Sequence, residues 1–188
     1  YGKDLLLYRF IEQTISELTQ VYDYNEIITP IFESTDLFKK PLGEHSEIVL
    51  KEMYSFKDRN DSSLTLRPEY TTPMIRASIS NNLLDKLPVK LFGFGPMFRR
   101  ERPQKGRQRQ FTQYGLEAIG SENPEQDTEV ILVAYRIYEM LGIKDLDLNL
   151  NSIGSKNSRS KYVVALKKYL SPFKSELSDI SQKRLESN

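Results

Sequence analysis

Apolar residues recur at helical spacing near the start of the chain. Every third or fourth position from Leu7 to Leu18 is apolar, and this repeat predicts an amphipathic helix over residues 3–20. Residues 26–32 read EIITPIF and favour a strand, but Pro30 has no amide proton to donate to a neighbouring strand. We therefore expect this strand at the edge of a sheet or at an interface.

The next pattern predicts a hairpin followed by a helix. Residues 34–50 lack a regular repeat and are expected to form a loop. Two β-rich segments, 52–57 and 63–67, flank the turn sequence DRND and predict a β-hairpin. A proline then ends the second strand, and Thr72 is placed to cap a helix over residues 73–83.

Two longer segments alternate between apolar and polar positions, as the strands of a sheet do. Residues 91–102 and 109–118 are expected to pair as a hairpin. The sequence NPEQ at 123–126 resembles a capping box, and the helix that it begins should end at Gly142. A further alternation predicts a strand over residues 146–150.

Composition adds limits to this picture of an α+β protein. The 188 residues carry a net charge of +1, so attraction to nucleic acid would have to come from local clusters of charge. The absence of cysteine excludes disulfides, thiolate metal sites and a cysteine nucleophile, and no apolar run is long enough to span a membrane. We expect a core over residues 1–154 and a more polar helical region over 155–188. Since the chain opens at Tyr1, it is expected to be part of a longer protein.

Strand parity divides the long hairpin into two faces. One face is apolar, with Phe92 and Phe94 on the first strand and Tyr114 and Leu116 on the second. The other face mixes charge, amide, aromatic and glycine residues. On the first strand these are Gly93, Gly95, Met97, Arg99 and Glu101, and on the second Phe111, Gln113, Gly115 and Glu117.

The mixed face is interpreted as the floor of a pocket. Arg99 has the fork geometry that binds a carboxylate or phosphate. Phe111 could stack on a planar base, and Glu101 could accept a hydrogen bond from its exocyclic amino group. Gln113 and Glu117 could fix a small polar ligand, while the glycines would let it approach the backbone. The alternative is an ordinary solvent-facing side of an antiparallel sheet, but glycines and a phenylalanine are unusual there.

Two other segments leave their alternatives open. The hairpin tip, from Arg102 to Arg109, is either a solvated loop or a clamp for polyphosphate or an RNA backbone. Glu69 and Thr71 either hold an ammonium group or simply cap the following helix. His45, the single histidine, has no partners in the sequence that would indicate a metal or catalytic site, so no metal-binding residue is predicted.

Several segments together resemble the histidyl-tRNA synthetase family of class II aminoacyl-tRNA synthetases. FRRERPQKGRQRQFTQYGLE, residues 98–117, is similar to the family's motif 2, and YDYNEIITPIFE is similar to motif 1. LTLRPEYT resembles the histidine-binding LRPEGT segment, and LNLNSIGS resembles the strand that leads into the insertion domain. The resemblance implies an antiparallel sheet flanked by helices, followed by the start of a helical insertion.

For ATP, the resemblance implies four roles on the hairpin. Arg99 would contact both the amino-acid carboxylate and the α-phosphate, and would be the catalytic residue. Glu101 would read the adenine amino group, Phe111 would stack under the adenine, and Arg107 would hold the terminal phosphates. Mg²⁺ would enter with ATP as part of the substrate complex, and no permanently bound cofactor is expected.

For the other substrates, the resemblance implies contacts on both sides of the hairpin. Histidine would be held by Glu69, Thr71, Gln113 and Glu117. The acceptor end of tRNA(His) would approach Arg102, Gln104 and Arg109. A homodimer, a cytoplasmic location and no membrane association are expected in addition.

The resemblance favours a histidine–tRNA ligase, although the chain departs from the family pattern. Tyr70 stands where the family usually has glycine, and Gln108 where an aromatic residue is common. No motif 3 arginine is found in these residues, so they are expected to be inactive alone. One alternative is a non-catalytic regulatory subunit of histidine biosynthesis, but such relatives generally lose the motif 2 arginine and glutamate that are present here. Another is a plain RNA-binding module.

Overall fold

The structure is a computed structural model that describes residues 1–188 except 43–48, 50–51, 103, 153 and 188. The chain divides into two compact units, Tyr1–Lys144 and Asp145–Asn188. The predicted boundary near residue 154 stays a prediction. No helix among the described residues is long and apolar enough to cross a membrane.

The first sheet is built around the predicted long hairpin. Its strands are β1 (Asn25–Glu26), β5 (Val89–Phe98) and β6 (Gln110–Ile119), in the order β1-β5-β6. β1 runs parallel to β5, whereas β5 and β6 are antiparallel over their whole length. The hairpin is therefore confirmed, with strand ends within a few residues of those expected.

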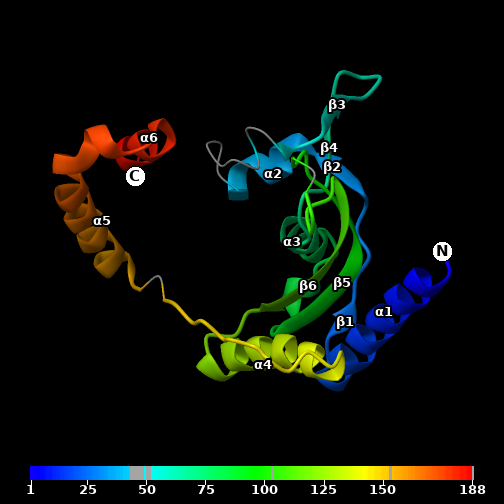
Figure 1. The fold of residues 1–188 in the computed structure, drawn as a ribbon. Helices are drawn as coiled ribbons and strands as arrows, with labels where there is room; N and C mark the ends of the chain where they lie inside the picture. The colour runs from blue at the N-terminus through cyan, green and yellow to red at the C-terminus, as the bar shows by residue number, and fades with distance from the viewer. Residues whose placement is uncertain (43–48, 50–51, 103, 153, 188) are drawn as a thin grey trace. The chain divides into compact units, whose positions relative to one another are not determined.

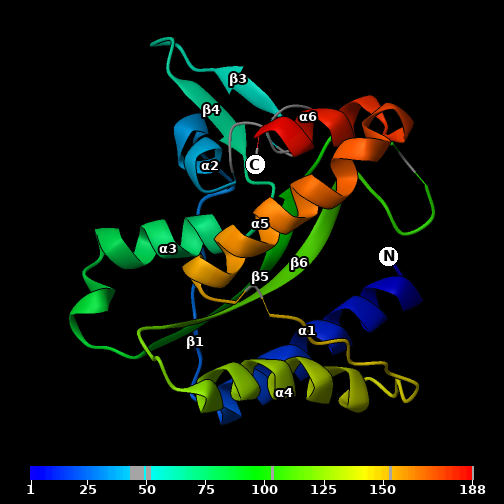
Figure 2. The ribbon, with the colours of Figure 1, turned by 90° about the vertical axis from the view of Figure 1, so that its left-hand side faces the viewer.

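Helices cover both faces of this sheet (Figures 1 and 2). On one face lie α1 (Lys3–Val21) and α4 (Pro124–Met140), whose buried residues pack against the aromatic side chains of β5 and β6. On the opposite face lies α3 (Thr71–Ser80), followed by the short 3-10 helix η2 (Leu83–Asp85). The face assigned as apolar from strand parity is confirmed as the α1–α4 side.

A second sheet holds the segments on either side of the shorter hairpin. It contains β2 (Phe32–Ser34), β4 (Ser63–Leu66) and β3 (Ser55–Lys57), all antiparallel, in the order β2-β4-β3. The helix α2 (Thr35–Leu42) continues directly from β2. The predicted β3–β4 hairpin is confirmed.

Two expectations before residue 50 are wrong in part. The strand expected over 26–32 is divided, because β1 joins one sheet and β2 the other, with Pro30 between them. Both strands are edge strands, as the proline predicted. The loop expected over 34–50 begins as helix α2, which buries Phe38 completely. Residues 43–48, including His45, lie outside the described residues.

The helix starts also differ from prediction. Helix α3 begins at Thr71 instead of Pro73, and the side chain that accepts from its free amide groups is Glu69, not Thr72. Asn123 is the cap of α4 as expected, but the reciprocal bonds of a capping box are not formed. The Gln126 side chain instead donates to Glu129.

A polar network ties α4 to the sheet on the α1–α4 side. Glu129 accepts hydrogen bonds from Lys90, Gln126 and the hydroxyl of Tyr24, with Lys90 Nζ 2.7 Å from Glu129 Oε1. Burial opposes ionisation of Glu129, but these donors outweigh it and lower the pKa of the carboxyl. The charged form of Glu129 is therefore the one that the fold stabilises.

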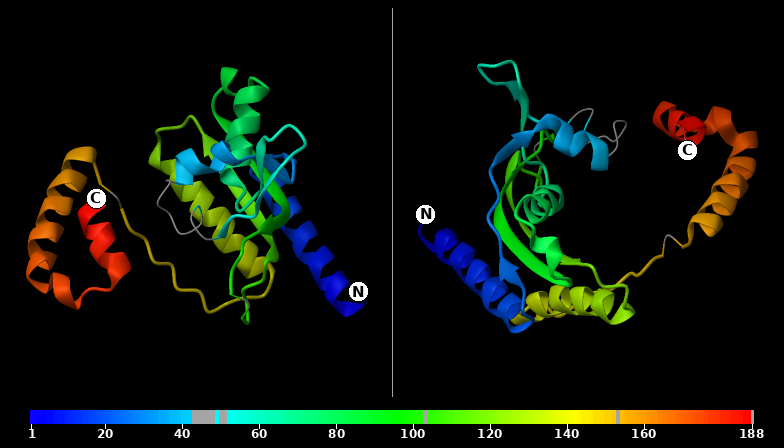
Figure 3. Two further views of the ribbon diagram at one scale, coloured as in Figure 1. Left: turned by 90° about the horizontal axis from the view of Figure 1, so that it is seen from above. Right: turned by 180° about the vertical axis from the view of Figure 1, so that it is seen from behind.

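The second unit contains α5 (Lys156–Leu170), the 3-10 helix η3 (Ser171–Glu176) and α6 (Asp179–Ser187) (Figure 3). Its helical character was expected. The strand predicted over 146–150 is wrong, since residues 145–152 form neither helix nor strand. A strand needs a partner for its backbone groups, and no strand among the described residues pairs with this segment.

Candidate functional site

The mixed face of the β5–β6 hairpin forms a row of facing pairs. The register places Met97 opposite Phe111, Gly95 opposite Gln113, Gly93 opposite Gly115, and Leu91 opposite Glu117. The predicted members of the mixed face that lie within β5 and β6 therefore share a face, whereas Arg99 and Glu101 follow the end of β5 at Phe98. This is the face that α3 covers.

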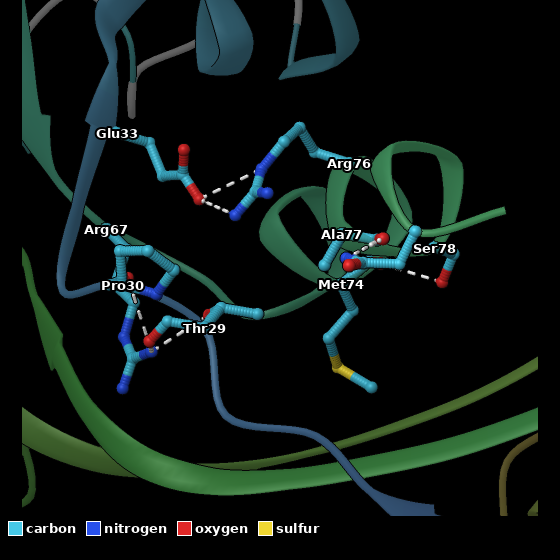
Figure 4. Close-up of polar contacts among 9 residues, drawn as sticks. Thr29, Pro30, Glu33, Arg67, Met74, Arg76, Ala77 and Ser78 are labelled. Atoms are coloured by element: carbon cyan, nitrogen blue, oxygen red, sulfur yellow. Dashed lines mark hydrogen bonds and ion pairs between the residues drawn. The ribbon is translucent and has the colours of Figure 1, made fainter. Parts of the chain in front are cut away.

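The segment before α3 is fixed to the hairpin by Arg67, which is only 2% exposed. Its Nε donates to the carbonyl of Pro96 at 2.9 Å, and its Nη1 donates to the carbonyl of Thr29 at 2.8 Å. Figure 4 shows Arg67 beside Thr29 and Pro30, while Arg76 of α3 reaches Glu33 of β2. One guanidinium thus joins β5 to the connection between β1 and β2.

Tyr70 lies against the glycines of the hairpin, and this contact replaces the role that the sequence suggested for them. A Cβ atom at Gly93 would lie 2.4 Å from the Tyr70 ring, and one at Gly115 would lie 2.9 Å from Tyr70 Cβ. At Gly95 it would lie 2.6 Å from Nη2 of Arg67. The three glycines therefore admit the side chains of Tyr70 and Arg67, where a ligand had been expected to approach the backbone.

The two sides of the expected amino-acid site meet at Thr71. Its hydroxyl donates to the carboxylate of Glu117, which connects the first turn of α3 to β6. Burial raises the pKa of Glu117, the Thr71 hydrogen bond lowers it, and nearby Glu69 raises it further; the net direction is upward. Glu69 is buried and accepts from the amide of Thr72 at 2.9 Å. Its capping role is thus present, and it does not exclude ligand binding by the carboxylate.

Gln113 contributes an unused acceptor to this region. Its Oε1 is buried and has no hydrogen-bond partner among the residues that the structure describes. Buried polar atoms normally find a partner, because leaving one unpaired costs free energy. A ligand with a donor group would satisfy this atom.

Arg99 and Phe111 lie together at the outer end of the β5–β6 pairing, Arg99 just after the last residue of β5 and Phe111 within β6. The Arg99 guanidinium is 5.1 Å from the centre of the Phe111 ring, and its Nε donates to the carbonyl of Pro68 at 2.8 Å. This is the one hydrogen bond of the Arg99 side chain within the described part of the chain, so its Nη groups have no acceptor among those residues. An aromatic surface and a fixed cation are therefore adjacent, as the sequence predicted.

The hairpin tip continues the row with two charged groups. Arg107 Nη1 lies 3.3 Å from Glu101 Oε2, an ion pair without hydrogen-bond geometry. The Glu101 side chain is 16% exposed, whereas that of Arg107 is 63% exposed. A turn with Gly106 at φ +80° closes the tip through mutual backbone hydrogen bonds between Gln104 and Arg107. Arg102, Gln104 and Arg109 are exposed around it.

The structure brings most of the predicted site residues together. Ten of the eleven lie on the hairpin or in the first turn of α3, and Glu69 lies two residues before the start of that helix. Sequence reasoning missed the roles of Arg67 and Tyr70. The LRPEYT segment had signalled binding, but its residues Arg67 and Tyr70 gave no local sign of contact with the distant glycines.

Hollows elsewhere carry different chemistry. One of about 880 Å³ lies in the second unit between α5 and α6, with Arg159 and Tyr162 among its lining residues. Its described lining residues include no carboxylate and no counterpart of the stacked Arg99 and Phe111 pair of the hairpin. We therefore place the candidate site on the hairpin.

Comparison with protein families agrees with this placement. A family model described as histidyl-tRNA synthetase matches residues 4–155, which include the whole hairpin and the segment before α3. The histidine–tRNA ligase of Staphylococcus saprophyticus is 51% identical over 96% of this chain and 44% of its own length. That of Thermosipho melanesiensis is 49% identical over 100% of this chain and 45% of its own length. The chain therefore spans slightly less than half the length of these curated relatives.

Solved structures give the same fold. The crystal structure of apo S. aureus histidyl-tRNA synthetase matches with a TM-score of 0.79 and 41% identity, over 100% of this chain and 44% of that one. An ATP phosphoribosyltransferase regulatory subunit/histidyl-tRNA synthetase from Bacillus halodurans C matches with a TM-score of 0.65 at 22% identity, over 94% of this chain and 49% of that one. The second likeness concerns the fold alone.

Proposed function

Because this chain belongs to the histidyl-tRNA synthetase family, we propose that the protein is an ATP-dependent histidine–tRNA ligase. It would activate histidine as histidyl-adenylate and transfer it to tRNA(His). The observation that carries the proposal is the continuous face on which Arg99 and Phe111 adjoin Gln113, with Glu69 and Thr71 beside it.

Arg99 is proposed to bring the two reacting anions together. The carboxylate of histidine is already ionised at neutral pH and needs no base before it attacks the α-phosphate of ATP. What the reaction requires is alignment of the two groups and stabilisation of charge on the phosphoryl oxygens. The Arg99 side chain is suited to both, because Nε is anchored on the carbonyl of Pro68 while its Nη groups have no acceptor among the described residues.

The nucleotide is proposed to lie along the outer half of the hairpin. Phe111 would stack on the adenine, and Glu101 would accept from its amino group. In this structure Glu101 is paired with Arg107, so that contact would open as Arg107 turns to the terminal phosphates. Mg²⁺ would arrive with ATP, because it keeps phosphate and water oxygens as ligands and needs few protein contacts.

Histidine is proposed to lie on the inner half. The buried acceptor of Gln113 and the carboxylate of Glu69 suit the α-amino group, with Thr71 at the rim. Glu117 would contact the imidazole. Since burial raises the pKa of Glu117, an N–H donor from the imidazole would stabilise its charged form.

The exposed tip is proposed to meet the acceptor end of tRNA. Arg102, Gln104 and Arg109 are exposed around the turn, and phosphate contacts of this kind weaken as salt rises. A cytoplasmic location is proposed together with this role, as a compartment in which tRNA is charged for translation.

A homodimer is proposed through the first helix and the segment that follows it. Both segments carry large apolar side chains that are exposed in this chain and that a partner subunit would cover. The residues are Leu5, Leu6, Leu7, Phe10, Ile28, Ile31 and Phe32. Light scattering of the purified natural protein measures its mass, and a monomeric mass would contradict this assignment.

Histidine-dependent exchange of pyrophosphate into ATP, measured on the natural full-length protein, tests the proposed function. Arg99→Ala should lower the rate about 100-fold or more, since it removes the aligned charge. Arg100→Ala is the matched control, because Arg100 is exposed and its described contact is through the backbone amide to Glu52. Normal exchange in Arg99→Ala would overturn the role of Arg99.

Two further outcomes test the assignment as a whole. A wild-type protein that binds histidine but exchanges no pyrophosphate would instead be a regulatory relative. The 188 residues alone are expected to exchange none, and robust exchange by them would contradict the expectation that they are inactive in isolation.

A further inference from the structure

We propose that Tyr70 is a positioning residue for the amino-acid site, and that its ring holds Glu69 and Thr71 in register with Gln113 and Glu117. The ring does this by filling a cradle of three glycines, Gly93, Gly95 and Gly115, referred to below as the glycine cradle. The inference rests on the proposed function for its ligand, histidine, but the cradle itself is a feature of the fold.

The fit between Tyr70 and the glycine cradle is tight at both ends of the side chain. Over β6, a Cβ atom at Gly115 would lie 2.9 Å from Tyr70 Cβ and 3.3 Å from Cγ. Over β5, a Cβ atom at Gly93 would lie 2.4 Å from Cε1 and 2.7 Å from Cζ. Any side chain at either position would displace the ring, so the glycines and Tyr70 are matched to each other.

The ring is also flanked by Arg67, whose Nη2 lies over Gly95 of the same sheet. The Arg67 guanidinium lies 4.6 Å from the ring centre, close enough for a cation–π contact. Arg67 is itself fixed by the carbonyls of Thr29 and Pro96. Tyr70 is 0% exposed, so the ring has no free direction in which to move.

The position of the Tyr70 ring in the glycine cradle determines where the binding groups lie. Gly115 stands between Gln113 and Glu117 on the same face of β6, and the Tyr70 side chain begins directly above it. The residues on either side of Tyr70 in the chain are Glu69 and Thr71, and Thr71 bonds to Glu117. A displacement of the ring would therefore move both binding residues of this segment relative to β6.

The surroundings of the Tyr70 hydroxyl indicate that the aromatic ring, and not the hydroxyl group, positions the site. It is buried and has no hydrogen-bond partner among the described residues. A hydroxyl left in this state does not stabilise the fold. The shape of the ring is therefore the feature that positions the site, and phenylalanine should replace tyrosine without loss.

Three variants of the natural full-length protein test the inference by pyrophosphate exchange, with histidine affinity measured in parallel by calorimetry. Tyr70→Ala should raise KM for histidine about ten- to hundredfold, as expected when binding groups are displaced by about 1 Å. KM for ATP should change by less than about threefold, since Phe111 and Arg107 lie outside the glycine cradle. Tyr70→Phe should restore the wild-type KM for histidine. Val133→Ala, a core truncation on the α1–α4 side, should leave both KM values near those of wild type.

A double-variant cycle tests the cradle without any assay of activity. Gly93→Ala should lower the midpoint of thermal unfolding by about 3–8 °C when Tyr70 is present, because the added methyl group would overlap the ring atoms Cε1 and Cζ. The same change should cost little in the Tyr70→Ala background, where those ring atoms are absent.

The inference is overturned if Tyr70→Ala leaves histidine KM and affinity unchanged, or if Tyr70→Phe is as impaired as Tyr70→Ala. An equal rise in both KM values, or equal effects of Gly93→Ala in the two backgrounds, would also overturn it. If wild type binds histidine but exchanges no pyrophosphate, the proposed function fails, while weaker histidine binding by Tyr70→Ala still supports positioning. If wild type does not bind histidine, both are overturned.

Discussion

Replacement of Arg67 by lysine tests how the segment before α3 is fixed to the two sheets. The Arg67 guanidinium donates in two directions, to the carbonyl of Pro96 at 2.9 Å and to that of Thr29 at 2.8 Å, and it also covers the ring of Tyr70. A lysine ammonium is a single point of charge without the planar fork, so it cannot serve both carbonyls and stack on the ring. Lysine keeps the buried charge and loses most of its contacts.

The magnitude follows from those contacts. A buried carbonyl left without its donor costs about 1–3 kcal/mol, and the lost cation–π contact adds about 0.5–2 kcal/mol. Retaining one hydrogen bond offsets part of this loss. We therefore expect Arg67→Lys to lower the free energy of unfolding of the first unit by about 2–4 kcal/mol.

Urea unfolding followed by far-ultraviolet circular dichroism measures the effect, because the chain has no tryptophan to report by fluorescence. Arg59→Lys, in the exposed turn between β3 and β4, is the matched control and should change the free energy by less than about 0.5 kcal/mol. A deficit below about 0.5 kcal/mol would refute the reasoning.

Two titratable groups on the α1–α4 side give further predictions. The lowered pKa of Glu129 means that its pairing with Lys90 stabilises the fold at neutral pH and ceases to do so as pH falls through that pKa. Lys90→Met should therefore lower the free energy of unfolding by about 1–2 kcal/mol at neutral pH and by less in acid, as measured by urea unfolding at stepped pH. The control Lys57→Met, at an exposed ion pair, should lower it by less than about 0.5 kcal/mol. A Lys90→Met deficit that persists unchanged in acid argues against this pairing. Burial raises the pKa of Tyr114 to about 12, so its neutral form stabilises the fold below the ordinary tyrosine pKa of about 10, and that contribution is lost as pH rises toward the folded value. Tyr114→Phe should lose less stability than wild type over this alkaline range, and equal losses in the same unfolding assay would contradict the assignment.

Local periodicity predicted the parts of the fold that depend on one segment or on two adjacent ones. The helix near the N-terminus and both hairpins were expected, and the two faces of β5–β6 followed from the alternation of side chains alone. These features are readable because strand alternation and helical repeats are properties of consecutive residues. The motif residues on β6 were identified for the same reason.

Features that depend on distant partners were not predicted. The alternating residues 146–150 lack a neighbouring strand among the described residues and do not form one. The expected strand at 26–32 is interrupted where Arg67, more than thirty residues later, takes the carbonyl of Thr29 as an acceptor. Neither result could be read from the local sequence, because each depends on which groups the fold brings near.

The glycines of the hairpin separate what the sequence determined from what only the tertiary structure decided. Their positions on the mixed face, beside Gln113 and Glu117, were determined by the order of residues alone. What they admit was decided only when α3 closed over the sheet and placed Tyr70 on Gly93 and Gly115. A glycine in a strand allows another group to approach the backbone closely. Which group does so depends on the packing of segments that are distant in the sequence.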